Sequence, residues 1–292
     1  MISILGTIFA GLLGLAFGSF LNVCLSRWPE DESVVKPRSH CRHCDHTLAW
    51  WENVPLVSWL ALCGRCRSCG AWIGLRYPLV ELAVGALWSA VAWQALSTTL
   101  GHDRTSFDLP LVCATAIGMM IFYWGLVALA VLDAENLWLP DWLTLPGIAL
   151  GFVLVNLQAY LDRSRVKIEM GQILAAVSSA LGIVAAAGLV LMIRWAYTWI
   201  RHREGIGLGD AKLMALLAAW LGLPGALLAF GLGVVLGALV ALVLLAVPAP
   251  RANQNGWALR KLPLGTFLCV GGIMSALWGD LIIGTYLRWG GF

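Results

Sequence analysis

Charged residues are scarce in this sequence of 292 residues: they make up 12% of it, whereas an average soluble domain carries about 25%. A water-soluble globule is therefore excluded, and the mean hydropathy of +0.82 agrees with this conclusion. The net charge of only +3 is too small to argue for a nucleic-acid partner. The sequence also lacks a Gly-rich loop after a strand, which is the usual mark of a nucleotide cofactor site.

Hydrophobic residues make up 60% of the chain and gather in long runs without charge. Roughly 20 such residues suffice to cross a bilayer as a helix, so membrane lipid is the expected surrounding. One run, 213–247, is too long for a single span, and Leu221-Gly222-Leu223-Pro224-Gly225 is a break signal within it. We therefore expect an all-α membrane protein with about eight transmembrane helices, from the runs at 2–25, 77–100, 109–132, 141–161, 171–200, 213–247 and 264–289.

The basic residues predict the orientation of these helices. With the N-terminus outside, fourteen of the 19 basic residues lie in cytoplasmic loops, as the positive-inside rule requires. The five on the other side are Arg104, Arg163, Arg165, Lys167 and Arg288. One cytoplasmic loop, 133–141, departs from the trend, since it has three acids and no Lys or Arg. Its charge is therefore expected to serve something other than topology.

The first cytoplasmic loop contains two Cys-x-x-Cys pairs, Cys41 with Cys44 and Cys66 with Cys69, separated by 21 residues. Four thiolates at about this spacing favour one tetrahedral zinc ion, and a reducing cytoplasm favours metal over disulfides. A four-thiolate site has no open position, so the zinc would be structural and would order the loop. Two alternatives stay open: an empty site, or replacement of one thiolate by Cys63, His40, His43 or His46.

Acidic residues at the ends of apolar runs are the candidates for catalysis. Asp133 ends the third run, and Asp210 follows Gly207-Leu208-Gly209 at the start of the sixth, so both lie on the cytoplasmic side. Two carboxylates brought together there cannot both ionise, and one would act as a base on a shared water while the other keeps a proton. This is aspartyl-protease chemistry without a metal. The alternative is that both residues only cap or solvate helix ends.

Two further acids have open roles. Asp141 starts the fourth run after Leu139-Pro140, where a cap or hinge is as consistent as chemistry. Glu81 lies one turn into the second run and either pairs with Arg76 or binds a substrate.

These features, in this order, resemble those of the type IV prepilin peptidases, the leader peptidases and N-methyltransferases of type IV pilus and type II secretion systems. The resemblance covers residues 18 to 265 and rests on the four Cys and on Gly18-Ser19-Phe20-Leu21-Asn22-Val23, Glu52-Asn53-Val54-Pro55, Arg76-Tyr77-Pro78-Leu79-Val80-Glu81, Asp133, Leu139-Pro140-Asp141, Gly207-Leu208-Gly209-Asp210-Ala211-Lys212 and Pro263-Leu264-Gly265.

The resemblance implies a Gly-x-Gly-Asp aspartic endopeptidase of the bacterial inner membrane with Asp133 and Asp210 as the catalytic pair. Its substrates would be type IV prepilins or pseudopilins, cut after the Gly that ends a short basic leader, at the cytoplasmic face. The acidic residues Asp133, Glu135 and Asp141 would then attract the leader.

The resemblance also implies transfer of a methyl group from S-adenosylmethionine to the new N-terminal residue, an activity that depends on the zinc loop. By motif position, Glu52, Asn53, Gly64 and Glu81 are assigned to methyl transfer. The sequence departs from the family at Cys63, where Gly or Arg is usual, and at Pro263-Leu264-Gly265-Thr266, where Pro-Phe-Gly-Pro is commoner.

The expected domains are a first transmembrane helix at 1–25, a four-Cys zinc-ribbon-like loop at 26–76 and a transmembrane peptidase core at 77–292. Two other functions remain as alternatives. A transporter or channel subunit with a zinc-ribbon docking loop would place its acids near the bilayer midplane and show related halves. A noncatalytic membrane scaffold would tolerate the loss of both aspartates.

Overall fold

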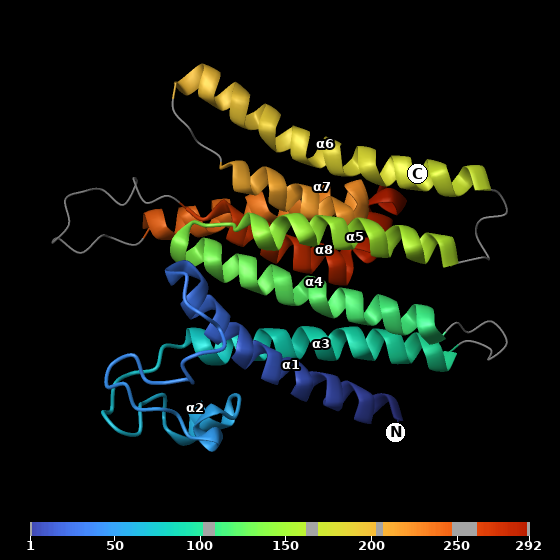
Figure 1. Cartoon of the computed structure of the whole chain (residues 1–292). Helices are drawn as coiled ribbons and strands as arrows, with labels where there is room; N and C mark the ends of the chain where they lie inside the picture. Colours follow the sequence, from blue (N-terminus) through green and yellow to red (C-terminus); the bar gives the residue numbers. More distant parts are fainter. Residues whose placement is uncertain (1, 102–108, 162–168, 203–206, 247–261, 291–292) are drawn as a thin grey trace. The chain divides into compact units, whose positions relative to one another are not determined.

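The structure is a computed structural model that describes residues 2–101, 109–161, 169–202, 207–246 and 262–290 (Figure 1). Several basic residues used above to predict the orientation lie outside the described residues: Arg104, Arg163, Arg165, Lys167, Arg203, Arg251, Arg260 and Lys261.

The described residues are helical and contain no strand, which confirms the all-α expectation. By packing, the chain divides into two compact units, Met1–Ala128 and Leu129–Phe292. The boundaries predicted above, at residues 25 and 76, divide the chain by function and stay a prediction.

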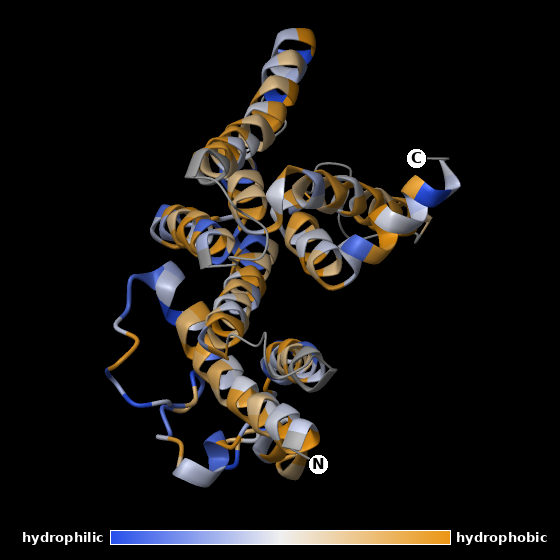
Figure 2. Ribbon diagram, turned by 90° about the vertical axis from the view of Figure 1, so that its right-hand side faces the viewer, coloured by the Kyte–Doolittle hydropathy of each residue, from blue (hydrophilic) through white to orange (hydrophobic). Residues whose placement is uncertain are grey.

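The first unit contains α1 (Ile2–Arg27), α3 (Arg76–Gly101) and most of α4 (Leu109–Asn136). Between α1 and α3 lies the polar loop, with the 3-10 helices η1 (Trp28–Glu30) and η2 (Trp50–Asn53) and the short helix α2 (Val57–Ala61). Figure 2 shows this loop as hydrophilic and the long helices as mainly hydrophobic.

Glycines allow α1 and α3 to approach closely. A Cβ on Gly14 would lie 2.9 Å from the Cα of Gly85, and one on Gly18 would lie 2.7 Å from the Cα of Glu81. Small residues at such crossings let helix backbones meet in a membrane, where apolar burial alone does not drive association. The crossing fixes the C-terminal end of α1 beside the start of α3.

The second unit contains the end of α4, α5 (Asp141–Leu161), α6 (Glu169–Arg201), α7 (Leu208–Ala246) and α8 (Leu264–Trp289). Helices α5, α6 and α8 all pack against α7, which is therefore the centre of this unit (Figure 1).

Helix α7 reverses its direction at Gly222. This residue has φ 68° and ψ 173°, a backbone region that is essentially confined to glycine, and Pro224 follows it. Gly237 packs against the ring of Phe267, which follows Gly265 by two residues in α8. Gly265 in turn lies against the Asp133 carboxylate. Leu139 contacts Gly265 and also Gly209, which lies beside Asp210 at the start of α7. In a straight helix Asp210 and Gly237 would be roughly 40 Å apart, so the second half of α7 must return toward its start.

The break predicted at residues 221–225 is thereby confirmed, and the expected eight helical segments are present when the halves of α7 are counted separately. By length and composition, seven helices of the described residues could cross a membrane, with α7 taken as one. The chain is a multi-pass membrane protein.

Candidate functional site

Asp133 lies at the end of α4, where hydrogen bonds from α8 hold its carboxylate. The side-chain Oδ2 accepts hydrogen bonds from the Thr266 backbone N at 2.6 Å and from the Thr266 Oγ1 at 3.2 Å. The same hydroxyl also contacts the Ala130 carbonyl oxygen at 2.9 Å. Asp133 is only 6% exposed, so these contacts replace solvation by water.

Asp210 lies in the first turn of α7 and is 8% exposed. Its Oδ2 accepts a hydrogen bond from the Gly207 backbone N at 3.1 Å, as the third residue of a helix does in a capping box. The capping alternative is thus realised in part. A solvated cap would, however, be exposed, and this carboxylate is buried.

The two carboxylates lie at the same end of this unit, because Leu139 contacts both Gly209, next to Asp210, and Gly265, which lies against Asp133. The Leu139 side chain packs between two glycines. A Cβ on Gly209 or on Gly265 would lie 3.0 Å from the Leu139 Cδ1. A Cβ on Gly265 would also lie 2.9 Å from the Asp133 Oδ2. The glycines of the two motifs therefore let α7 and α8 close around the acidic pair.

Buried carboxylates in this arrangement have the groups that general acid and base catalysis needs. Two like charges that lie close together in a buried site favour one shared proton. One carboxylate can then take a proton from water while the other donates one. No metal ligand set other than the four Cys is found among the described residues, and the pair requires none.

Asp141 has a structural partner instead. Its Oδ1 accepts a hydrogen bond from the Lys212 Nζ at 2.5 Å, which ties the start of α5 to the start of α7. The side chain of Asp141 is 58% exposed, so this is a solvated ion pair that stabilises little. It engages Lys212, two residues after Asp210, with the carboxylate of Asp141.

The first unit contains the cluster of four cysteines that the Cys spacing predicts. The Sγ atoms of Cys41, Cys44, Cys66 and Cys69 all lie within 4.8 Å of one another. Two of the separations, Cys41 to Cys69 and Cys44 to Cys66, are 3.9 Å. A tetrahedral zinc with Zn–S bonds of about 2.3 Å needs sulfur atoms about 3.8 Å apart, so the thiols fit this ion.

Both Cys pairs lie in similar turns. The Cys41 N donates to the His46 carbonyl, and the Cys66 N donates to the Ala71 carbonyl. Backbone N–H groups of Cys69 and Ser68 lower the pKa of the Cys66 thiol to about 6, which favours the thiolate that a metal needs. Cys63 is exposed and lies outside the cluster, and no histidine joins it.

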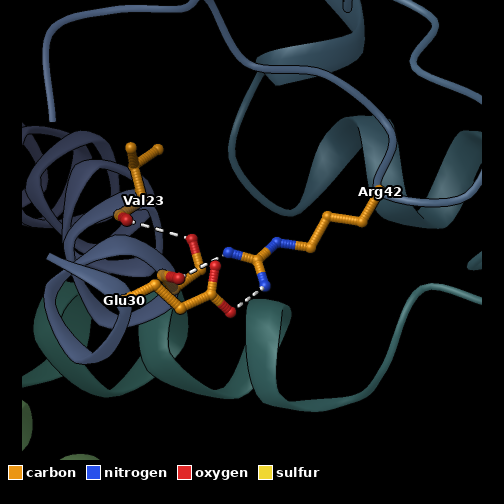
Figure 3. A network of polar contacts seen from close by, with 4 residues as sticks. Val23, Glu30 and Arg42 are labelled. Carbon is orange, nitrogen blue, oxygen red and sulfur yellow. Dashed lines mark hydrogen bonds and ion pairs between the residues drawn. The ribbon is translucent and has the colours of Figure 1, made fainter. Parts of the chain in front are cut away.

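Arg42, inside the first Cys pair, ties this turn to the end of α1. Its guanidinium donates hydrogen bonds to Glu30 Oε1 at 3.2 Å and to the Ser26 carbonyl (Figure 3). The Ser26 hydroxyl in turn donates to the Val23 carbonyl at 3.0 Å. The metal-binding loop is therefore fixed against a membrane helix of its own unit.

A cavity of about 630 Å³ lies between this loop and the adjoining helices α1 and α3, and Glu52, Asn53 and Glu81 line it. Glu52 Oε2 accepts the Ala49 N at 2.7 Å and contacts the His46 Nε2 at 3.3 Å. The Ala49 N–H, with a smaller contribution from His46, lowers the pKa of Glu52, so this residue is ionised. Glu81 Oε2 accepts the Leu56 N at 2.8 Å. Three of the four residues assigned to methyl transfer thus share one cavity.

Gly64, the fourth, is not among the lining residues. It has φ +66°, and a Cβ there would lie 2.9 Å from the Trp59 ring. Its position is explained by the turn and by the packing of Trp59, and a role in methyl transfer stays a prediction.

Several contributors to these sites escaped the sequence reasoning. Thr266 was noted only as a departure from a motif, and Leu139 only as part of one. Asn22, a polar residue in a charge-free apolar run, lines the cavity and is 2% exposed. Cys269, three residues after Thr266 in α8, is fully buried.

Comparisons with known proteins agree with this architecture. Residues 12–95 match the bacterial peptidase A24 N-terminal domain, and residues 120–242, which contain both aspartates, match the type IV leader peptidase family. A relative from Stutzerimonas stutzeri is 33% identical over 95% of this chain and 92% of its own length. The chain belongs to the type IV leader peptidase family.

Two further relatives extend this family assignment. One from Pseudomonas aeruginosa is 34% identical over 96% of this chain and 93% of its own length. One from Burkholderia pseudomallei is 36% identical over 93% of this chain and 85% of its own length. All three are described as prepilin leader peptidase/N-methyltransferase. No solved structure matches the chain significantly.

Proposed function

We propose that the protein is a membrane aspartic endopeptidase that removes the leader of type IV prepilins or pseudopilins, with Asp133 and Asp210 as its catalytic pair. The observation that supports this proposal is that two buried carboxylates, from α4 and α7, lie on either side of Leu139. Membership of the leader peptidase family and the names of the relatives support the substrate class.

In this proposal the two carboxylates activate one water molecule. The hydrogen bonds from Thr266 orient Asp133, and the bond from Gly207 orients Asp210, so neither side chain must reorganise when substrate arrives. One aspartate accepts a proton from the attacking water, and the other donates a proton to the carbonyl of the scissile bond. Cleavage would follow the Gly that ends the leader.

The acidic segment 133–141 would attract a substrate whose leader is basic. Asp133, Glu135 and Asp141 lie within nine residues of one another, with no basic residue between them. Lys212 already binds Asp141, so a basic leader residue would compete with an internal lysine for this carboxylate. The contact would favour substrates whose positive charge lies just before the cut.

We also propose that the first unit methylates the new N-terminal residue. S-adenosylmethionine, when bound, supplies an electrophilic methyl group to an amine. The cavity of about 630 Å³ is within the usual range of about 300 to 1,000 Å³ for small-molecule sites, and its acidic lining suits a cationic ligand. Glu52, Asn53 and Glu81 would bind the methyl donor, and Gly64 would shape the adjoining turn.

The four cysteines are proposed to hold a structural zinc. It would keep the two turns together and so maintain the shape of the cavity, because Cys41 and Cys66 belong to its lining. The loop 26–76 would serve methyl transfer, and the region 77–292 would contain the peptidase core.

The proposed location is the bacterial inner membrane, with the N-terminus outside and both sites at the cytoplasmic face. The distribution of basic residues supports this orientation. The transporter alternative is not favoured, because both aspartates lie in terminal turns of their helices rather than in the middle of a span.

Cleavage of a prepilin peptide by the reconstituted protein tests the proposal. Asp133→Asn and Asp210→Asn should each lower the rate by about 10² to 10⁴-fold, the usual contribution of a general acid or base. Asp280→Asn is the matched control, because Asp280 is an exposed acid of α8 roughly 20 Å along the helix from Thr266. Full activity of both variants would refute the catalytic pair.

A further inference from the structure

The cavity of the first unit contains two buried hydrogen-bond acceptors that receive no hydrogen bond from any of the residues that the structure describes. They are the Asn22 Oδ1 and the Glu52 Oε1. Asn22 is 2% exposed, and the Glu52 side chain is 1% exposed. A buried polar atom without a partner costs about 1 to 3 kcal/mol, and more when it is charged. An unsatisfied pair in one cavity therefore indicates atoms that a ligand completes.

Each acceptor is held in place by its other polar atom. Asn22 donates a hydrogen bond from Nδ2 to the Tyr77 carbonyl at 2.9 Å, which fixes the amide and leaves only Oδ1 available. Glu52 uses Oε2 for the Ala49 N and for His46, which leaves Oε1 available. Both residues line the cavity. Neither acceptor can turn toward another protein group without breaking an existing contact.

The charge of Glu52 restricts what can bind there. Because the Ala49 N–H lowers its pKa, Glu52 is ionised, and its Oε1 is half of a buried carboxylate. A neutral donor would satisfy the hydrogen bond but would add no positive charge beside this carboxylate. A primary ammonium satisfies both needs with one short charge-assisted bond.

The cationic groups near the cavity are engaged elsewhere. Arg27 donates to the carbonyls of Ser33 and Pro37, both at 2.7 Å. Arg42 is bound to Glu30 and Ser26, and Arg67 lies 4.9 Å above the Trp51 ring. Arg67 and His46 act on the charge of Glu52, and His46 pairs with Oε2, but the Oε1 atom receives no hydrogen bond from the described residues and can accept one from a cationic ligand.

We propose that Glu52 binds the α-ammonium group at the amino-acid end of the methyl donor, and that Asn22 Oδ1 accepts a second hydrogen bond from the same ligand. The inference rests on the proposed methyl transfer and makes Asn22, a residue of the first membrane helix, part of the donor site. It also makes the amino-acid end, rather than the nucleoside alone, necessary for tight binding.

Binding measurements on the purified full-length protein in detergent test this inference without turnover. S-adenosylhomocysteine has the ammonium group, whereas 5′-methylthioadenosine has the same nucleoside and sulfur but lacks the amino-acid end. Glu52→Gln should weaken the binding of S-adenosylhomocysteine about tenfold to a hundredfold and change that of methylthioadenosine less than about threefold. Asn22→Ala should weaken S-adenosylhomocysteine about tenfold.

Asp31→Asn is the matched control, because Asp31 is an exposed carboxylate of the same loop that does not line the cavity. It should bind S-adenosylhomocysteine within about twofold of the wild type, since a solvated charge contributes little. Zinc content and thermal unfolding of each variant show whether the loop has kept its fold. A second substitution, Asn22→Ser, checks the first acceptor with a smaller change in packing.

Each result separates the inference from the proposed function. Wild-type binding that Glu52→Gln and both Asn22 variants leave unchanged overturns the inference alone. Equal weakening of both ligands by Glu52→Gln overturns the ammonium assignment and places the carboxylate on the nucleoside. A wild-type protein that cleaves prepilin but binds neither ligand overturns the methyl-transfer proposal, and the inference with it.

Discussion

Replacement of Gly265 by alanine is expected to disturb catalysis through a defined contact. The added Cβ would lie 2.9 Å from the Asp133 Oδ2 and 3.0 Å from the Leu139 Cδ1. Ordinary contacts to carbon are roughly 3.5 to 4.0 Å, so Asp133 or α8 must move by about half an ångström. This movement would also alter the hydrogen bonds from Thr266, the residue that follows Gly265.

The size of the effect follows from the required movement. A misplacement of 1 Å can cost about 10²-fold in rate, so a shift of half that size should lower kcat about tenfold. Overpacking should also cost about 1 to 3 kcal/mol of stability. The assay is cleavage of a prepilin peptide by reconstituted protein, with thermal unfolding measured on the same sample.

Gly284→Ala in the same helix is the matched control. A Cβ on Gly284 would meet no atom within 4 Å, so cleavage should stay at the wild-type rate and helix stability should rise by a few tenths of a kcal/mol to about 1 kcal/mol. A Gly265→Ala protein that cleaves within twofold of the wild type would refute the close approach of α8 to Asp133.

Three further predictions concern the rest of the molecule. Cys66→Ser should remove zinc and weaken binding of the methyl donor more than tenfold, while lowering prepilin cleavage much less. Metal analysis, binding assays and cleavage assays can check this, and an equal loss of donor binding and of cleavage would contradict it. Because the pKa of Glu52 is lowered in the folded loop, its contribution to loop stability should be complete above pH 4.5 and should disappear as the pH falls through this lowered pKa. Hydrogen exchange of the Ala49 amide, which donates to Glu52, reports this loss. Constant protection of the amide from exchange down to about pH 2 would oppose this reasoning. Gly222→Ala should cost about 1 to 3 kcal/mol in thermal unfolding, whereas Gly231→Ala, with open space around its Cβ, should cost none.

The sequence predicted most of the fold because its strongest signals are local. Long apolar runs gave the membrane helices, and Gly222 with Pro224 marked the reversal inside α7. The two Cys-x-x-Cys pairs predicted their own cluster, since the spacing within each pair and the short segment between the pairs are typical of four thiolates on one zinc ion. These predictions needed no knowledge of contacts between distant helices.

The parts that escaped prediction depend on contacts between residues far apart in the sequence. Thr266 reaches Asp133 from a helix that begins more than 120 residues later. The pairing of Asp141 with Lys212 likewise joins the starts of two helices. Spacing within a motif carries no information on such contacts, so the acidic segment could be predicted but its internal ion pair could not.

The cavity of the first unit could not be predicted from the sequence for the same reason. Asn22 and Glu52 belong to separate motifs, and each has a local reason to be polar or acidic. Only their common burial, with one unsatisfied oxygen each, makes them candidates for binding a ligand.

The separation of the Asp133 and Asp210 carboxylates, measured in an experimental structure with an uncleaved prepilin bound, tests the central claim most directly. A water shared through hydrogen bonds of about 2.6 to 3.2 Å requires nearest oxygens at most roughly 5.5 Å apart. We predict a separation within that limit, with the scissile carbonyl between the two side chains. Carboxylates more than about 8 Å apart, with the scissile bond at another site, would contradict the account.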